Sequence, residues 1–183
     1  LHFLRKAGVR AGQNVLIYGA SGSVGVFAVQ LAKELGARVT GVCSTVNVDM
    51  VRALGADAVV DYTREDYSQA GRIYDVIIDT VGKSLYARGA RALKRGGVFV
   101  QIALSDVGSM FDWMWASMTG AAKVVGGIAD GSAEDLAYLK ELIEAGRLKT
   151  VIDRRFKLGE IAEAHRLAES GHKKGHVVIV MDT

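Results

Sequence analysis

The sequence predicts an α/β fold, a doubly wound parallel sheet of six strands with a C-terminal helix–strand appendage. An apolar run over residues 15–18 breaks into a turn with glycines at 19, 22 and 25, and an amphipathic helix follows. A second apolar run, 38–42, completes a strand–helix–strand unit within about thirty residues. Apolar runs then alternate with helical patterns as far as residue 147, which favours parallel strands in the order 3-2-1-4-5-6 with helices on both faces.

The first helix follows directly on the glycine turn and has one apolar face. Its apolar residues recur at three- and four-residue spacing and are Val24, Phe27, Ala28, Leu31, Ala32 and Leu35. The unpaired amides at such a helix start favour an anion, and glycine lets a diphosphate approach the backbone. In a three-layer Rossmann fold this is the dinucleotide site. We predict that it is formed by Gly19, Ala20, Ser21, Gly22, Ser23, Val24 and Gly25.

The remaining elements of the sheet follow from apolar runs and their punctuation. Strands are expected at 58–60, 74–79, 98–102 and 123–127. The expected helices are the end of one at 1–6, a short one over 47–54 capped by Asn47 or Thr45, a crossover from Gly82 to Gly96 and Gly97, and one marked by Leu136, Leu139, Leu142 and Ile143. We therefore assign residues 1–147 to one cofactor-binding domain.

Two segments fall outside this rhythm. Residues 105–119 carry both tryptophans and three of the five methionines, so they seek an apolar partner. Packing within the domain, a subunit or interdomain contact and a substrate wall all stay open for them. Residues 148–183 contain a possible strand at 151–152, a helix from 159 and a strand at 177–180. Since six strands complete the sheet, this C-terminal segment is expected to belong elsewhere.

Composition limits the classes of function. A chain of 183 residues, 50% of them hydrophobic, can bury one good core. The net charge of +3 is spread over interspersed residues, which argues against nucleic-acid binding. Cys43 is the single cysteine, so an intrachain disulfide and a Cys-rich zinc site are excluded. No signal peptide or membrane span is visible in the sequence, and we expect a cytoplasmic protein.

The motifs resemble those of a known family over essentially the whole chain. The stretch 12–25, with its Ala20-x-Gly22-x-x-Gly25 pattern, and the later stretches 54–57 and 75–82 look like the cofactor half of a medium-chain dehydrogenase/reductase. Within that superfamily the chain is most similar to the quinone oxidoreductase and zinc-binding-dehydrogenase-like branch. The resemblance implies hydride transfer between a nicotinamide cofactor and an activated carbonyl or alkene, such as a quinone or enone.

The resemblance also implies that a catalytic domain precedes the segment that begins here. That domain supplies most of the pocket for a small-molecule substrate, and residues 158–181 return to it. We accordingly expect this chain to be inactive alone and name no catalytic residue in it. The four histidines form no metal constellation, and His172 and His176 are interpreted as turn residues rather than metal ligands. Backbone near Val81, Ile102 and Ala103 is implied to position the adenine, ribose and nicotinamide.

The residues that follow the second expected strand predict that the site prefers NADPH to NADH. An NAD site normally has an acidic residue there, which binds the ribose 2′-hydroxyl and would repel a 2′-phosphate. Here Ser44 and Thr45 offer hydroxyl donors, Asn47 lies beside them, and Tyr62 resembles the tyrosine that closes this pocket in quinone oxidoreductases. Relatives often have a cation near residues 46 and 47, so Arg64 or a lysine of the C-terminal segment has to replace it.

Several alternatives remain at this point. A short-chain dehydrogenase needs Tyr-x-x-x-Lys and a Rossmann methyltransferase needs a tighter glycine loop, and neither motif is present. Half of a zinc-dependent alcohol dehydrogenase, or a non-catalytic nucleotide-binding sensor or structural module, would share the fold. Exposed sheet edges and apolar patches seek partners, so we expect a homodimer.

Overall fold

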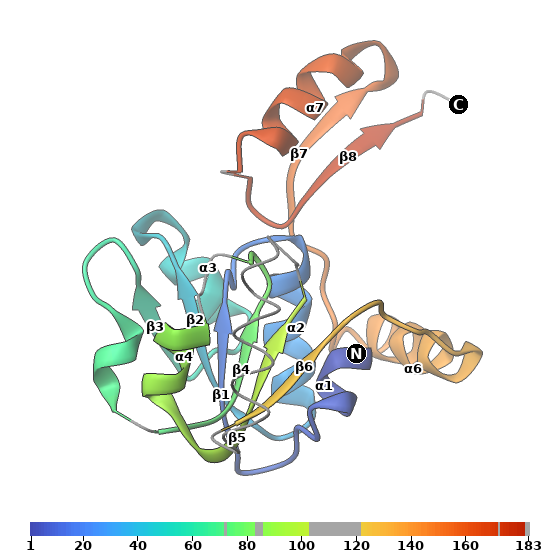
Figure 1. Ribbon diagram of the computed structural model, residues 1–183. Helices are drawn as coiled ribbons and strands as arrows, with labels where there is room; N and C mark the ends of the chain where they lie inside the picture. Colours follow the sequence, from blue (N-terminus) through green and yellow to red (C-terminus); the bar gives the residue numbers. More distant parts are fainter. Residues whose placement is uncertain (72, 83–85, 103–121, 172, 182–183) are drawn as a thin grey trace.

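The computed structural model describes residues 1–71, 73–82, 86–102, 122–171 and 173–181, and its main body is a six-stranded sheet (Figure 1). The strand order is β3-β2-β1-β4-β5-β6, and every neighbouring pair is parallel. The strands are β1 (Asn14–Tyr18), β2 (Arg38–Cys43), β3 (Ala58–Asp61), β4 (Tyr74–Asp79), β5 (Leu93–Gln101) and β6 (Lys123–Gly126). The predicted doubly wound architecture and strand order are confirmed.

Helices cover both faces because successive strand residues point to opposite sides. Val15 and Ile17 point into the hydrophobic core on one face of the sheet, and Leu16 between them points into the core on the opposite face. The first face carries α1 (His2–Lys6), α2 (Ser23–Glu34), α3 (Val48–Ala53) and α6 (Ala133–Glu144). The second face carries the 3₁₀ helix η2 (Tyr67–Ala70) and α4 (Tyr86–Ala92). All three strand residues are fully buried, which is why the strand reads as a continuous apolar run.

Strand β5 begins earlier than the sequence predicts. The crossover helix was expected to continue to Gly96 and Gly97, but α4 ends at Ala92 and Leu93 already pairs with Tyr74 of β4. A register shift follows, and Gly96 takes the left-handed conformation (φ 72°) that such an irregularity needs. The extension contains charged residues because it lies at the exposed start of the strand.

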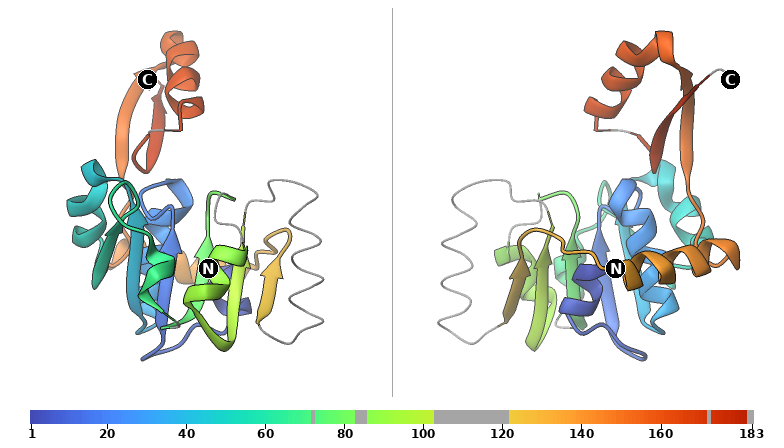
Figure 2. Two further views of the ribbon diagram at one scale, coloured as in Figure 1. Left: turned by 60° about the vertical axis from the view of Figure 1, so that its left-hand side comes forward. Right: turned by 90° about the vertical axis from the view of Figure 1, so that its right-hand side faces the viewer.

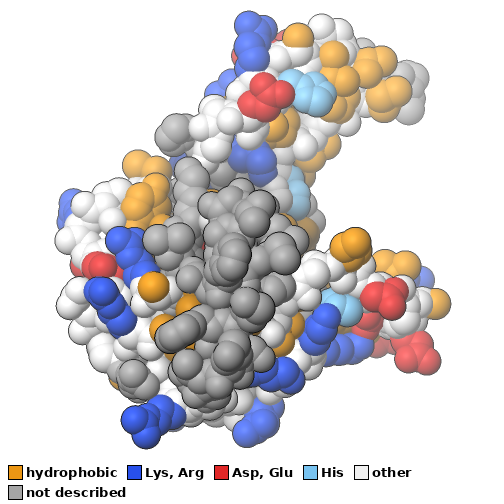
Figure 3. Space-filling model, viewed as in Figure 1, with side chains coloured by type: hydrophobic (Ala, Val, Ile, Leu, Met, Phe, Trp, Pro, Cys, Tyr) orange, Lys and Arg blue, Asp and Glu red, His pale blue; other side chains and the backbone are white. Residues whose placement is uncertain are grey.

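The C-terminal segment forms a separate unit of β7 (Ile152–Lys157), α7 (Ile161–Glu169) and β8 (His176–Val180). Strands β7 and β8 pair in parallel with each other and do not join the six-stranded sheet. Figure 2 shows this unit standing away from the sheet, and Figure 3 shows hydrophobic side chains gathered on it. Those exposed by two-fifths or more are Leu158, Ile161, Val180 and Met181.

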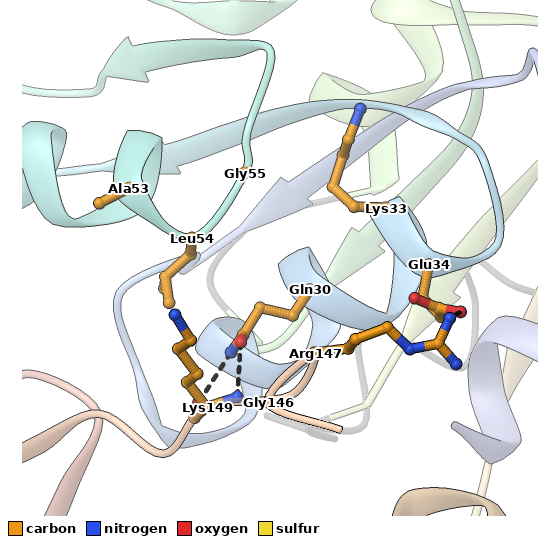
Figure 4. A pocket seen from close by; sticks show the side chains of 9 residues that line it. All are labelled: Gln30, Lys33, Glu34, Ala53, Leu54, Gly55, Gly146, Arg147 and Lys149. Atoms are coloured by element: carbon orange, nitrogen blue, oxygen red, sulfur yellow. Dashed lines mark hydrogen bonds and ion pairs between the residues drawn. The ribbon is translucent and has the colours of Figure 1, made fainter. Parts of the chain in front are cut away.

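A buried glutamine of α2 binds the segment that connects α6 to β7 (Figure 4). Gln30 of α2 donates from Nε2 to the carbonyl of Lys149 at 2.9 Å, and its Oε1 accepts from the Lys149 amide at 2.8 Å. The surrounding pocket, of about 340 Å³, also contains Lys33 and Arg147. Two of the three cations that line it are paired, Lys33 with Asp57 and Arg147 with Glu34, and the third, Lys149, binds Gln30 through its backbone. The pocket therefore lies where the connecting segment joins α2.

We expect the substitution Gln30→Leu to lower the free energy of unfolding by about 1 to 2 kcal/mol, since it leaves the part-buried amide and carbonyl of Lys149 without this partner. Urea unfolding followed by circular dichroism measures the change. The control is Gln13→Leu, which removes a single exposed hydrogen bond to the Arg10 amide and should have a much smaller effect. Equal losses for the two variants would contradict the role assigned to Gln30.

Candidate cofactor-binding site

The predicted site residues meet at one edge of the sheet because all six strands are parallel. The glycine turn follows β1, residues 44–47 follow β2, Tyr62 follows β3, and Val81 and Ile102 follow β4 and β5. In doubly wound sheets the ligand lies at this carboxyl edge, where the strand order reverses between β1 and β4. Ala103, the last of the predicted residues, lies outside the described residues.

The glycine turn is held against β2 by its own backbone. The amides of Gly19 and Ala20 both donate to the carbonyl of Val42, at 3.1 and 3.0 Å, and Gly19 has φ 81°. A side chain on Gly25 would collide with the Gly19 carbonyl and the Ala20 backbone, so Gly25 lets α2 approach β1. A side chain on Gly22 would meet nothing closer than the Gly19 carbonyl at 3.5 Å. The space beside Gly22 is thus open to a ligand.

The C-terminal unit contacts this turn directly. The amide of Gly175 donates to the carbonyl of Ser21 at 2.8 Å, and the hydroxyl of Ser23 donates to the carbonyl of Gly175 at 2.7 Å. Lys173 donates from Nζ to the same carbonyl at 2.8 Å and also to the Ser23 hydroxyl. Ser23 opens α2, so an ammonium group lies at the positive end of this helix. Two adjacent positive groups favour an anionic ligand there.

Asn47 connects the turn after β2 to the glycine turn. Its Nδ2 donates to the hydroxyls of Ser21 and Ser44, at 3.2 and 3.1 Å. It therefore does not cap α3 with its side chain as the sequence suggested, and Thr45, the other expected cap, does not either. The Ser44 hydroxyl accepts a hydrogen bond in this arrangement, so its own proton remains available for donation to a ligand.

Thr45 lies beside a carboxylate that the sequence-based prediction did not consider. Its hydroxyl donates to Oδ2 of Asp61 at 2.5 Å, and Asp61 pairs in register with Cys43 across β2 and β3. Hydrogen bonds from Thr45 and then Thr63 hold the pKa of Asp61 below its usual value, so the carboxylate is charged at neutral pH. In this arrangement the single proton of the Thr45 hydroxyl is directed to Asp61, so donation by Thr45 to a phosphate stays a prediction.

The residues after β3, β4 and β5 differ in accessibility. Tyr62 is 56% exposed and Val81 is 44% exposed, so both side chains are available to a ligand. The buried carboxylate of Asp79 accepts from the amides of Val81 and Gly82, both at 2.9 Å, and the amide of Ile102 donates to the Asp79 carbonyl at 3.0 Å. Asp79 thereby holds the backbone amides of Val81, Gly82 and Ile102 at the carboxyl edge of the sheet.

An apolar groove of about 670 Å³ adjoins the first turn of α2. Val24 and Phe27 of α2, Ile102 and His176 line it together with side chains of α1 and α6. The His176 ring packs against Phe27 with their centroids 5.1 Å apart, and burial followed by the nearby Lys173 lowers the pKa of His176. The imidazole is therefore neutral at physiological pH.

Nothing in the described part of the chain gathers a metal-binding group of three or more His, Cys, Asp or Glu side chains. His172 lies outside that part. The thiol of Cys43 is buried, and burial, followed by the charge of Asp61, raises its pKa to about 11. It is therefore protonated at neutral pH and unsuited to act as a nucleophile. Among the described helices, none is long and apolar enough to cross a membrane.

Comparison with known proteins agrees with this geometry. Residues 54–179 match the family model described as "Zinc-binding dehydrogenase". The chain belongs to the zinc-binding dehydrogenase family. Within the medium-chain dehydrogenase/reductase superfamily it is quinone oxidoreductase-like, which confirms the resemblance of the motifs.

Individual relatives extend the match over nearly the whole chain. NAD(P)H oxidoreductase RTN4IP1 of Mus musculus mitochondria is 33% identical over 92% of the chain and 48% of its own length. The chloroplastic quinone oxidoreductase QR1 of Triphysaria versicolor is 34% identical over 91% of the chain and 52% of its own. The solved quinone oxidoreductase of Coxiella burnetii superposes with a TM-score of 0.87 at 32% identity, covering 96% of the chain and 55% of that structure. The chain spans about half the length of these relatives.

Three residues of the site escaped the analysis of the sequence as site residues. In the sequence Asp61 directly follows the strand expected at 58–60 and Asp79 ends the strand expected at 74–79, and a carboxylate at the carboxyl end of a parallel strand is itself a signal for such an edge. The sequence offers Arg64 or a lysine of the C-terminal segment as the cation for a 2′-phosphate, and of these lysines Lys173 lies at the glycine turn. Only the folded chain brings positions 23 and 173 together.

Substitution by alanine should affect stability differently at Gly22, which immediately precedes α2, and at Gly25, which lies in the first turn of α2. We expect Gly25→Ala to lower the free energy of unfolding by about 3 kcal/mol, because backbone atoms of the turn would have to move. Gly22→Ala should cost about 1 kcal/mol or less, since Gly22 has φ −79° and an open flank. Chemical unfolding of both variants measures this difference, and a reversed order would contradict the packing described here.

Proposed function

We propose that this chain is the NADPH-binding half of an oxidoreductase that transfers hydride between NADPH and a quinone, enone or other activated carbonyl or alkene. The observation that supports it best is the glycine turn at the start of α2, where the flank of Gly22 is open and the ammonium of Lys173 lies beside Ser23. An anionic diphosphate fits this combination of a helix start, a glycine and a cation.

The residues of this chain would bind and orient the cofactor. Amides of the first turn of α2 and Lys173 would hold the diphosphate. Val81 and Ile102, whose amides Asp79 holds, would lie along the nicotinamide half. The bound nicotinamide supplies the hydride. The apolar groove beside Val24 would exclude water from one side of that region.

Three groups at the ends of β2 and β3 favour NADPH, the cofactor that carries a 2′-phosphate. Ser44 keeps a proton for donation, Tyr62 is exposed, and Arg64 supplies a cation with a side chain that is 75% exposed. Asp61 opposes them with its negative charge. We therefore propose a modest preference for NADPH over NADH.

The names of relatives support the substrate class. Besides the quinone oxidoreductases, a trans-enoyl reductase of Aspergillus terreus is 30% identical over 94% of this chain. Quinones and enoyl groups share a polarised carbon–carbon double bond that accepts hydride. Since the chain spans about half of such relatives, we propose that it does not turn over substrate by itself.

Calorimetric titration of the 183-residue chain tests this function. We expect NADPH to bind more tightly than NADH by about tenfold or less, the weight of one charge-assisted contact that Asp61 partly offsets. The same sample should not reduce a benzoquinone steadily with NADPH. Absence of binding by either cofactor would overturn the proposed function, and turnover that scales with chain concentration would overturn the proposed inactivity of the chain alone.

Lys173→Met should weaken NADPH and NADH equally, by about tenfold, because the diphosphate is common to both. Lys174→Met is the matched control, since the neighbouring lysine contributes its backbone amide, not its ammonium, to a contact with Asp153. Fluorescence titration of both cofactors measures the effect. A loss confined to NADPH would place Lys173 at the 2′-phosphate instead of the diphosphate.

A further inference from the structure

Asp61 occupies the place from which a Rossmann domain distinguishes the two nicotinamide cofactors. It ends β3, is 8% exposed, and pairs in register with Cys43 at the end of β2. The loop after β2 normally contacts the ribose 2′-oxygen of a bound dinucleotide. The structure thus brings a carboxylate to this loop from the neighbouring strand, although the loop itself begins without one.

Both carboxylate oxygens of Asp61 accept hydrogen bonds from threonines. Oδ2 accepts from the Thr45 hydroxyl at 2.5 Å, and Oδ1 accepts from the hydroxyl and the amide of Thr63, at 2.7 and 3.0 Å. A hydroxyl has one proton to donate, so both threonines present only lone pairs to a ligand. Such oxygens can accept from a ribose 2′-hydroxyl, but they have nothing to donate to a phosphate.

The same carboxylate also pairs with Arg64. Nε of Arg64 lies 3.6 Å from Oδ2 of Asp61, on the side where Thr45 also binds. An arginine drawn toward a carboxylate is less available to a 2′-phosphate, and the carboxylate repels that phosphate directly. Each of these effects lowers affinity for NADPH and leaves NADH unaffected.

We propose that Asp61 is a positioning residue that limits cofactor selectivity, because it accepts the hydrogen bond of the Thr45 hydroxyl and attracts Arg64 away from the 2′ end of the site. This inference rests on the proposed dinucleotide-binding function and adds to it the residue that keeps the NADPH preference small. It assigns to Thr45 the role of an acceptor for the ribose, while Ser44 remains the donor.

Asp61→Asn tests the proposal with little change in shape. The Thr63 amide must still find an acceptor, so the amide oxygen replaces Oδ1 and the NH₂ group replaces Oδ2. The NH₂ group then donates to Thr45, which releases the hydroxyl proton, and it no longer attracts Arg64. We expect NADPH to bind about fivefold more tightly and NADH to change by less than about twofold in calorimetric titrations.

Asp57→Asn is the matched control at the opposite end of the same strand. Asp57 precedes β3, accepts from the amide of Val39 at 2.6 Å and pairs with Lys33 at 2.8 Å. Its neutralisation removes the same charge far from the carboxyl edge, so the ratio of the two affinities should not move. If Asp57→Asn and Asp61→Asn raised NADPH affinity by similar factors, the change in net charge would explain the effect, and the proposal would be overturned.

Thr45→Val provides a test that does not depend on how well the Asp61 variant folds. If the Thr45 proton is used by Asp61, this substitution leaves NADPH affinity within about twofold in the natural chain. In the Asp61→Asn background it should remove part of the gain. Selective weakening of NADPH by Thr45→Val alone would show that Thr45 donates to the phosphate and would refute the proposal.

The outcomes separate this inference from the function on which it rests. If both cofactors bind and Asp61→Asn changes them equally or weakens NADPH, Asp61 is structural and only the inference fails. If neither cofactor binds to the natural chain, the proposed function fails and the inference fails with it. A thermal unfolding curve for each variant confirms that affinities are compared between folded proteins.

Discussion

The site depends on the contact between Gly25 of α2 and the backbone of Gly19 and Ala20 at the end of β1. This contact lets the helix start almost on the strand, so that its first amides point across the carboxyl edge of the sheet. A larger residue would displace the helix from the strand. The cores on both faces of the sheet then fix the strand and the helix in this relation.

The second constraint is a contact between distant parts of the chain. Gly175 and Lys173 bind the backbone and side chains of the turn at 21–23, about 150 positions earlier in the sequence. Gln30 holds the connecting segment by two further hydrogen bonds. The C-terminal unit shares no strand with the main sheet, but these contacts attach it to the point where the diphosphate is proposed to bind.

The polar groups at the other end of the site determine which protons a ligand can receive. The side-chain amide of Asn47 donates hydrogen bonds to Ser21 and Ser44. Asp61 accepts hydrogen bonds from the hydroxyls of Thr45 and Thr63. A hydroxyl in the sequence is both a donor and an acceptor, and its neighbours decide which of these a ligand meets. Cofactor choice therefore follows from the network as a whole and not from the types of residue alone.

The sequence by itself determined the strand order, the glycine turn and the family. Buried parallel strands are apolar throughout, and the three-residue spacing of the glycines has few other uses, so local patterns carry this information. The tertiary structure decided that β5 begins at Leu93, because the charged residues that follow do not show the apolar pattern of a buried strand. It also decided the positions of Asp61 and Lys173. Lys173 and Ser23 are 150 positions apart, and Thr45 and Asp61 end neighbouring strands 16 positions apart. No local spacing encodes which acceptor a hydroxyl or an ammonium will find.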